Sequence, residues 1–208
     1  MLGHRAGAIL PILAILYCVG FTNLFLRSSF GVMAPGLQNE MSLSPAVLSM
    51  VASAFFFSYA LMQVPTGMLL DRFGARRTLG TMLVVTTIGA GIFAAGRSWE
   101  ALGAGRLLMG FGCAGVFTGA FYVLAQWLRP SQVVSQIGVV NGISASGVLC
   151  ATTPLALLIS VIGWRQSYWL FTAGVAVLTA LVLVVMRDAP PGSAPPASRN
   201  ETVMDTIR

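Results

Sequence analysis

The chain has 208 residues, of which 56% are hydrophobic and 9% are charged, and its mean hydropathy is +0.83. Soluble domains carry roughly 25% charged residues, so this composition excludes an ordinary soluble domain and indicates an integral membrane protein. The formal net charge of +6 does not indicate nucleic-acid binding. The arginines stand mostly singly at the ends of apolar segments, without a basic stripe interleaved with aromatic residues.

The residues that usually carry metal or acid-base chemistry are sparse. The three cysteines lie in separate apolar stretches without metal-ligand spacing, so we interpret them as small buried hydrophobic residues: Cys18, Cys113 and Cys150. The only histidine, His4, precedes the first apolar segment. A nucleophile at Ser144 or Ser146 has no histidine, lysine or carboxylate in the apolar segments to act as its base. We therefore predict no metal, no cofactor and no enzymatic activity.

The first apolar segment predicts a helix from about Ala8 to about Met33, after a short amino-terminal segment over residues 1–7. It is too long for a signal-peptide core and lacks a convincing cleavage site, so we interpret it as a membrane span. It contains Arg27. An arginine at the centre of a spanning helix costs about 2.5 to 3.5 kcal/mol and normally faces a protein interior or an aqueous cavity. The alternative is an arginine that snorkels to the outer interface.

The second helix is expected from Pro45 to about Leu70, after a turn over Pro35–Met41. Ser44 suits the N-cap position, and a proline suits the first helical position. Small and partly polar residues recur along this helix at helical spacing and predict one stripe, namely Ser49, Ser53, Phe56, Ala60, Gln63 and Gly67. Tyr59 and Gln63 offer hydrogen bonds to a neighbouring helix or to a solute, and the pattern leaves both roles open.

Four further apolar segments predict helices at about Leu79–Ala95, Ala101–Leu128, Val133–Ile162 and Ser167–Met186. GxxxG spacing, which is typical of close helix packing, occurs at Gly115 and Gly119 and again at Gly138 and Gly142. Pro154 predicts a kink inside its helix. In the turn before the last helix, Trp164 is expected at the membrane interface. Residues 189–208 contain four prolines and predict a flexible polar tail.

A charged turn over Gly67–Arg77 separates the second and third segments. It holds one carboxylate and three arginines, so it cannot lie in hydrocarbon. With the amino terminus inside, six arginines flank the spans on that side, namely Arg5, Arg72, Arg76, Arg77, Arg129 and Arg187, and two, Arg97 and Arg165, flank them on the other. The excess of arginine predicts that both termini are cytoplasmic.

The charged turn resembles the loop between helices 2 and 3 of the major facilitator superfamily. The family pattern has glycine, aspartate and basic residues at fixed spacing, matched here by Gly67, Asp71, Arg72, Gly74, Arg76 and Arg77. Arg106, Gly110 and Gly112 resemble the family's helix 4 motif, and Gly163–Arg165 resembles its turn before helix 6. The resemblance implies an all-α integral membrane fold. Six transmembrane helices over residues 8–188 would form one half of a major facilitator fold, a 3+3 inverted repeat, followed by a linker-like cytoplasmic tail over residues 189–208.

The resemblance extends to a branch of the family. Arg27, Phe30, Pro35 and Leu37 are spaced as in the helix 1 region of organophosphate:phosphate antiporters and anion:cation symporters, where the matching arginine binds the anionic group of the solute. Drug and proton antiporters have a Gly-Pro pair in helix 5, whereas Val148 follows Gly147 here, which makes drug export less favoured. The expected substrate-binding residues are Arg27, Asn23, Tyr59, Gln63 and Arg106.

In the family, the charged turn acts as a conformational gate. The resemblance therefore assigns this role to Gly67, Asp71, Arg72, Gly74, Arg76 and Arg77, with Asp71 pairing across to the second half of the carrier. The alternative is that these residues only enforce topology, which they would do in either case.

The expected function is secondary active transport of a small anionic organic solute by a symporter or antiporter in the bacterial inner membrane, since no P-loop is present. A complete family member has two six-helix halves with the solute site between them. We expect this chain to be the amino-terminal half, either truncated or paired with a second copy or another chain. The expected partners are the lipid bilayer and the solute, with no nucleic acid. The alternative function is that of an accessory or interaction membrane subunit without transport activity.

Overall fold

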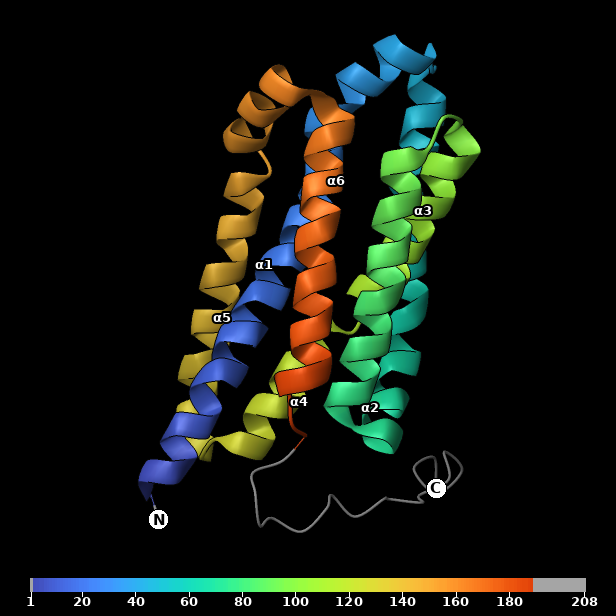
Figure 1. The fold of residues 1–208 in the computed structure, drawn as a ribbon. Coiled ribbons are helices and arrows are strands. Elements are labelled where there is room, and N and C mark those ends of the chain that lie inside the picture. Colours follow the sequence, from blue (N-terminus) through green and yellow to red (C-terminus); the bar gives the residue numbers. More distant parts are fainter. Residues whose placement is uncertain (1, 189–208) are drawn as a thin grey trace.

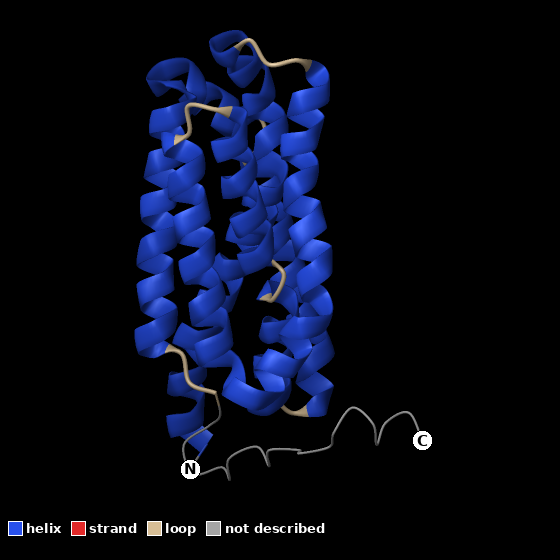
Figure 2. Ribbon diagram, turned by 90° about the vertical axis from the view of Figure 1, so that its right-hand side faces the viewer, coloured by secondary structure: helices blue, strands red, loops and turns tan. Residues whose placement is uncertain are grey.

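The computed structural model describes residues 2–188, with side chains from Ile9 onward. The predicted tail over residues 189–208 lies outside the described residues. Long helices stand side by side and form a bundle (Figures 1 and 2). They are α1 (Leu2–Met41), α2 (Pro45–Ala95), α3 (Trp99–Cys113), α4 (Val116–Trp127), α5 (Pro130–Cys150) and α6 (Thr153–Val185). No strand occurs over residues 2–188.

Two glycines reverse the chain inside elements that are otherwise helical. Gly74 in α2 has φ 78° and ψ 170°, and Gly163 in α6 has φ 82° and ψ 161°. This region of backbone space is almost exclusive to glycine. In Figure 1 the first run of α2 descends to the lower end of the bundle and the second run climbs back, and α6 turns in the same way at the upper end. The charged turn predicted over Gly67–Arg77 is helical on both sides of Gly74. Only Gly74 itself departs from helical geometry.

The start of α2 follows the prediction, but the end of α1 does not. The Val47 amide donates to the Ser44 hydroxyl at 3.3 Å, and Pro45 begins the helix. The predicted turn over Pro35–Met41 is wrong, since α1 continues to Met41. An internal proline removes one backbone hydrogen bond. Leu37 is fully buried against the core at this end, and its packing favours continuation of the helix.

The two helices predicted at Ala101–Leu128 and Val133–Ile162 are each interrupted. The first breaks at residues 114–115, between α3 and α4, and the sequence had not indicated this break. The second breaks at residues 151–152, between α5 and α6. Pro154 follows the second break at the first turn of α6, where a proline without an amide hydrogen is well tolerated. The predicted irregularity near Pro154 is therefore confirmed.

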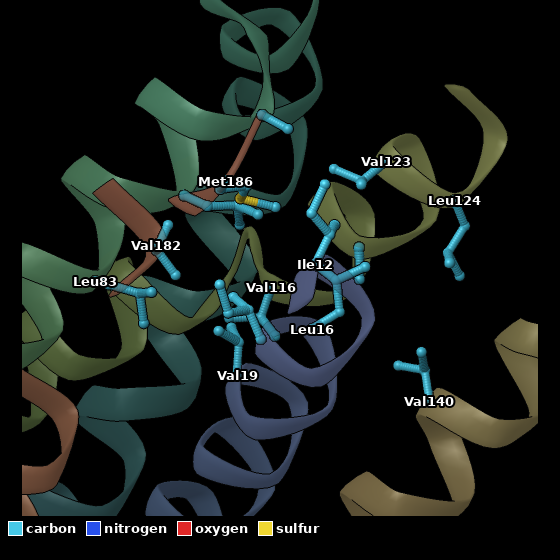
Figure 3. Close-up of a cluster of buried hydrophobic side chains, with 14 of the residues drawn as sticks. Ile12, Leu16, Val19, Leu83, Val116, Val123, Leu124, Val140, Val182 and Met186 are labelled. Atoms are coloured by element: carbon cyan, nitrogen blue, oxygen red, sulfur yellow. The ribbon is translucent and has the colours of Figure 1, made fainter. Parts of the chain in front are cut away.

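Five stretches of the described residues are long and apolar enough to cross a bilayer. They are Ile9–Met41, Pro45–Ala95, Trp99–Trp127, Pro130–Cys150 and Thr153–Val185. Their packing buries an apolar cluster at one end of the bundle. Figure 3 shows side chains from α1, α2, α4, α5 and α6 gathered there, including Ile12, Leu83, Val123, Val140 and Val182. The fold is therefore an all-helical membrane bundle.

Close helix packing occurs at one of the two predicted GxxxG pairs. A Cβ atom on Gly115 would lie 2.3 Å from the Met82 sulfur, and one on Gly119 would lie 2.7 Å from Leu79 Cδ2. The second run of α2 therefore approaches α3 and α4 closely, as this spacing predicts. A Cβ atom on Gly138 or Gly142 of α5 would meet nothing within 4 Å, so no packing contact among the described residues requires that pair.

The interpretation of the three cysteines as buried residues needs correction, and the structure adds a core role for Trp164. Cys113 is buried, but Cys150 is only partly buried and Cys18 is exposed. Trp164 is 6% exposed and packs edge-on against Phe93, so its ring contributes to the core beside the reversal at Gly163. Its indole Nε1 donates to Glu40, which gives its polar atom a partner inside the protein.

Candidate functional site

Arg27 is an exposed cation on the middle part of α1. Its guanidinium carbon lies 5.3 Å from the centroid of the Phe56 ring on α2, and Phe56 is itself 45% exposed. Within residues 9–188, Arg27 makes no hydrogen bond and no ion pair. Its donors are therefore available to a group from outside the chain.

The predicted stripe of α2 forms one exposed face of that helix. Its members Ser49, Ser53, Phe56, Ala60 and Gln63 are exposed, and Gly67 has open space around it. Ser49 and Ser53 donate to backbone carbonyls of their own helix, which satisfies their hydroxyl groups locally. Since Phe56 lies beneath Arg27, this face of α2 adjoins Arg27. We call this surface, Arg27 with the α2 stripe, the open face.

Gln63 and Tyr59 differ in how far they reach the open face. Gln63 is exposed and has no hydrogen bond among the described residues. Tyr59 is partly buried, and its ring stacks on Phe55 with centroids 6.1 Å apart. Gln63 can therefore contact a solute on the open face without rearrangement, whereas Tyr59 presents only part of its surface.

Arg106 of α3 is buried against α1 and α2 and does not reach the open face. It is 1% exposed, and its Nη1 donates to the Leu26 carbonyl of α1 at 3.0 Å. Its guanidinium carbon lies 5.0 Å from the centroid of the Phe30 ring and 4.5 Å from that of Phe55. Its Nε has no hydrogen-bond partner among the described residues. Aromatic faces and one carbonyl thus compensate a buried charge that would otherwise be costly.

Asn23 is also buried, at 1% exposed, and its side chain contacts the backbone where the chain is interrupted between α3 and α4. Its Nδ2 donates at 2.7 Å to the carbonyl of Cys113, the last residue of α3. A carbonyl at a helix end has no partner in its own helix, so this bond satisfies it. The Asn23 Oδ1 has no partner within the described part of the chain. Of the five expected substrate-binding residues, the structure brings Arg27 and Gln63 to the open face, exposes part of Tyr59, and buries Asn23 and Arg106.

The charged turn is fixed to the end of α6 by two reciprocal contacts. The Arg76 amide, at the start of the returning run of α2, donates to Asp188 Oδ1 at 2.7 Å. The Arg76 guanidinium donates from Nε to the Leu183 carbonyl at 2.8 Å and also from Nη2. Each contact pairs a charge with the helix end that favours it, a carboxylate with the amino end and a cation with the carboxyl end.

The other charged residues of the turn have no such role within the described chain. Asp71, Arg72 and Arg77 are exposed. The Arg72 guanidinium carbon lies 5.3 Å from the centroid of the Phe73 ring, and Asp71 makes no hydrogen bond or ion pair among the described residues. The turn therefore contains one arginine used to hold the fold and three charged groups that remain available to a partner.

Sequence reasoning missed two acidic residues with defined contacts. Asp188 was treated only as the end of a helix, although topology places it at the same end of the bundle as Arg76. Glu40 accepts from Arg165 Nε at 3.0 Å and from Nη2 at 2.8 Å, at the opposite end. Arg165 also donates to the Gly96 carbonyl at 2.7 Å. The predicted topology was the available signal, since it places Asp188 on the side of Arg76 and Glu40 on the side of Arg165.

A bundle of long apolar helices, with buried polar groups bonded to backbone and charges gathered at both ends, defines a multi-pass membrane protein. The family model described as Major Facilitator Superfamily matches residues 16–206. The chain belongs to this superfamily.

Curated relatives agree with this membership. A hexuronate transporter of Bacillus subtilis is 27% identical over 76% of the chain and 38% of its own length. A protein of Cupriavidus necator named as a probable sulfoacetate transporter is 24% identical over 88% of the chain and 42% of its own length. A quinolone resistance transporter of Acinetobacter baumannii is 30% identical over 79% of the chain and 38% of its own length. The chain thus spans about two fifths of the length of these relatives.

Solved structures share the fold. A crystal structure of a bacterial homologue of the human lysosomal transporter Spinster, in an inward-facing and unoccupied conformation, superposes with a TM-score of 0.73. It is 20% identical, and the match covers 98% of this chain and 47% of that one. The chain is therefore a multi-pass inner-membrane protein of a transporter family, and it is not an enzyme.

Proposed function

We propose that the chain is the amino-terminal half of a secondary active carrier for small organic anions. The observation that carries this proposal is Arg27, an exposed cation without a partner among the described residues, beside the polar stripe of α2. Arg106 of α3, in contrast, is buried and bonded to backbone. A guanidinium at the membrane's interior attracts a carboxylate or phosphate more strongly than in water and binds it through two parallel hydrogen bonds.

The proposed half has six membrane crossings arranged as two three-helix repeats. The reversals at Gly74 and Gly163 support this count, because each divides one continuous element into two antiparallel runs. The crossings would be α1, the two runs of α2, α3 with α4, α5 with the start of α6, and the remainder of α6. Even α5 alone, with 21 residues, reaches about 31 Å, the thickness of a bilayer core.

The proposed orientation places both chain ends in the cytoplasm. The start of α1, the charged turn and the end of α6 lie at the same end of the bundle in Figure 1. Arg72, Arg76 and Arg77 are at that end, whereas Arg97 and Arg165 are at the other. This distribution of arginines supports a cytoplasmic location for the first group.

The names of relatives support an anionic solute. Hexuronate and sulfoacetate are both organic anions, and their named transporters match along most of this chain. The quinolone resistance relative indicates a second solute class, drug-like molecules. Arg27 supports a solute that carries an anionic group, because its charge would attract anions and repel cationic solutes.

The solute site would be completed by a second six-helix half, which would cover the open face. The chain covers 38% of the length of the hexuronate transporter and 47% of the solved chain, which supports this part of the proposal. That half would come from a longer gene product, a second copy or another chain, and Asp71 would pair with it when the carrier faces outward. The gate role of the six charged-turn residues belongs to this proposal.

Charge selectivity tests the proposal. Binding of radiolabelled D-galacturonate and D-galactose, which differ at a carboxylate, can be measured by equilibrium dialysis with the chain in lipid nanodiscs. We expect binding of galacturonate and none of galactose at the same concentration. Equal binding of both sugars, or of neither, would reject an anion site in this half.

The alternative function, that of an accessory subunit without transport activity, gives a different result. An accessory subunit would leave the proteoliposome uptake of galacturonate unchanged when a complementary six-helix half is supplied. A carrier half would raise uptake above that of either half alone.

A further inference from the structure

A buried guanidinium lies directly behind the exposed pair of Arg27 and Phe56. Arg106 donates to the carbonyl of Leu26 at 3.0 Å, and its guanidinium carbon lies 4.5 Å from the centroid of the Phe55 ring. Leu26 immediately precedes Arg27 in α1, and Phe55 immediately precedes Phe56 in α2. A single side chain of α3 therefore contacts both helices at the residues adjacent to the exposed pair.

The contacts continue without a gap from the buried cation to the exposed one. The Phe55 and Phe56 rings meet edge to face, with centroids 5.6 Å apart and an interplanar angle of 75°. The Arg27 guanidinium carbon then lies 5.3 Å from the Phe56 centroid. This series of cation, ring, ring and cation gives Arg106 a physical route to the open face, although it does not reach that face itself.

Arg106 is suited to this role because it cannot move without loss. It is 1% exposed, so a shift would leave a charge without compensation in a medium of low dielectric constant. Asn23 supplies a reciprocal bond from α1 to the Cys113 carbonyl of α3 at 2.7 Å. The two bonds run in opposite directions between the same helices and fix α1 against α3 at Asn23 and at Leu26, three residues apart.

We infer that Arg106 is a positioning residue, which holds Leu26 and Phe55 and thereby sets the geometry of Arg27 and Phe56 on the open face. That this geometry receives an anion rests on the proposed function. The positioning itself is independent of any solute and can be measured without one.

Phenylglyoxal, which modifies exposed guanidinium groups, provides the measurement. The chain in lipid nanodiscs is treated with the reagent, and the modification rate of Arg27 is followed by peptide mass spectrometry, with exposed Arg97 as the internal reference. In Arg106→Met we expect the Arg27 rate to rise about two- to five-fold, the factor equivalent to one exposed cation–π contact. Arg106→Lys keeps a cation and one donor, so its rate should fall between the two.

A double-mutant cycle separates positioning from general loosening of the fold. Phe56→Ala removes the pair directly and should raise the Arg27 rate by a similar factor. If Arg106 acts through Phe56, the double variant Arg106→Met/Phe56→Ala should react no faster than Phe56→Ala alone. Thr179→Val removes a 3.1 Å contact between Thr87 of α2 and Thr179 of α6. Neither residue belongs to the series of contacts from Arg106 to Arg27, so this variant should leave the Arg27 rate unchanged.

Three results would overturn the inference: a wild-type Arg27 rate in both Arg106 variants, rate factors that multiply in the double variant, or an equal rise in Thr179→Val. If Arg106→Met fails to insert, the same cycle with Arg106→Lys decides. Adding D-galacturonate distinguishes this inference from the proposed function. Absence of protection of wild-type Arg27 would reject the anion site, while the rate changes without solute would still establish positioning.

Discussion

Replacing Gly74 with alanine should destabilise the chain through two separable effects. The backbone at φ 78° and ψ 170° is nearly exclusive to glycine, and forcing alanine into it costs about 1–3 kcal/mol. The new Cβ would lie 2.8 Å from Asp188 Cγ, so the carboxylate must move. Its bond to the Arg76 amide would then weaken, at a cost of about 1 kcal/mol. We expect a total loss of about 2–4 kcal/mol in the free energy of unfolding.

Unfolding in mixed micelles of dodecyl maltoside and sodium dodecyl sulfate measures this free energy. The matched control is Gly138→Ala, a helical glycine with nothing within 4 Å of its Cβ position, which should be neutral or stabilising by about 0.5–1 kcal/mol. In an Asp188→Ala background, Gly74→Ala should lose only the backbone part, about 1–3 kcal/mol. A Gly74→Ala variant as stable as wild type would refute the assignment of this glycine as the reversal point.

Two further substitutions test the two ends of the bundle. Asp71→Asn should slow the turnover of an assembled carrier with little change in solute affinity, because Asp71 would pair with the second half when the carrier faces outward. Asp71 is exposed and has no partner within the described residues. Unchanged turnover would leave the charged turn with a topological role only. Glu40→Gln should lower the free energy of unfolding by about 1 kcal/mol, a modest amount because Glu40 is 45% exposed and solvent screens its pair with Arg165. Chemical denaturation that detects no change would show that this ion pair does not stabilise the bundle.

Much of the fold could be predicted from local sequence rules. The Ser44 N-cap, the helix break beside Pro154 and the polar ends of the spans follow from residue chemistry that acts within a few positions. The extension of α1 through Pro35 could not be predicted in this way. It depends on burial of Leu37 against residues far along the chain.

The candidate site was also predicted where local helix geometry decides the outcome, and not where contacts between helices decide it. The periodicity of α2 correctly grouped its small and polar residues on one face, because a helix fixes which side chains point together. Whether an arginine in a span faces outward or inward depends on neighbouring helices, so the sequence analysis expected both Arg27 and Arg106 to bind substrate, although only Arg27 is exposed. The partnership of Arg76 with Asp188 joins residues 112 positions apart and needed the folded chain to be seen.

In the proposed carrier, Arg27 holds the anion site of this half. The dissociation constant for D-galacturonate, compared between wild type and Arg27→Gln in lipid nanodiscs, tests it most directly. Losing a charge-assisted hydrogen-bonded pair should weaken binding about ten- to hundred-fold, while Arg97→Gln, at an exposed helix end, should bind as wild type does. Equal affinity in wild type and Arg27→Gln would contradict the account.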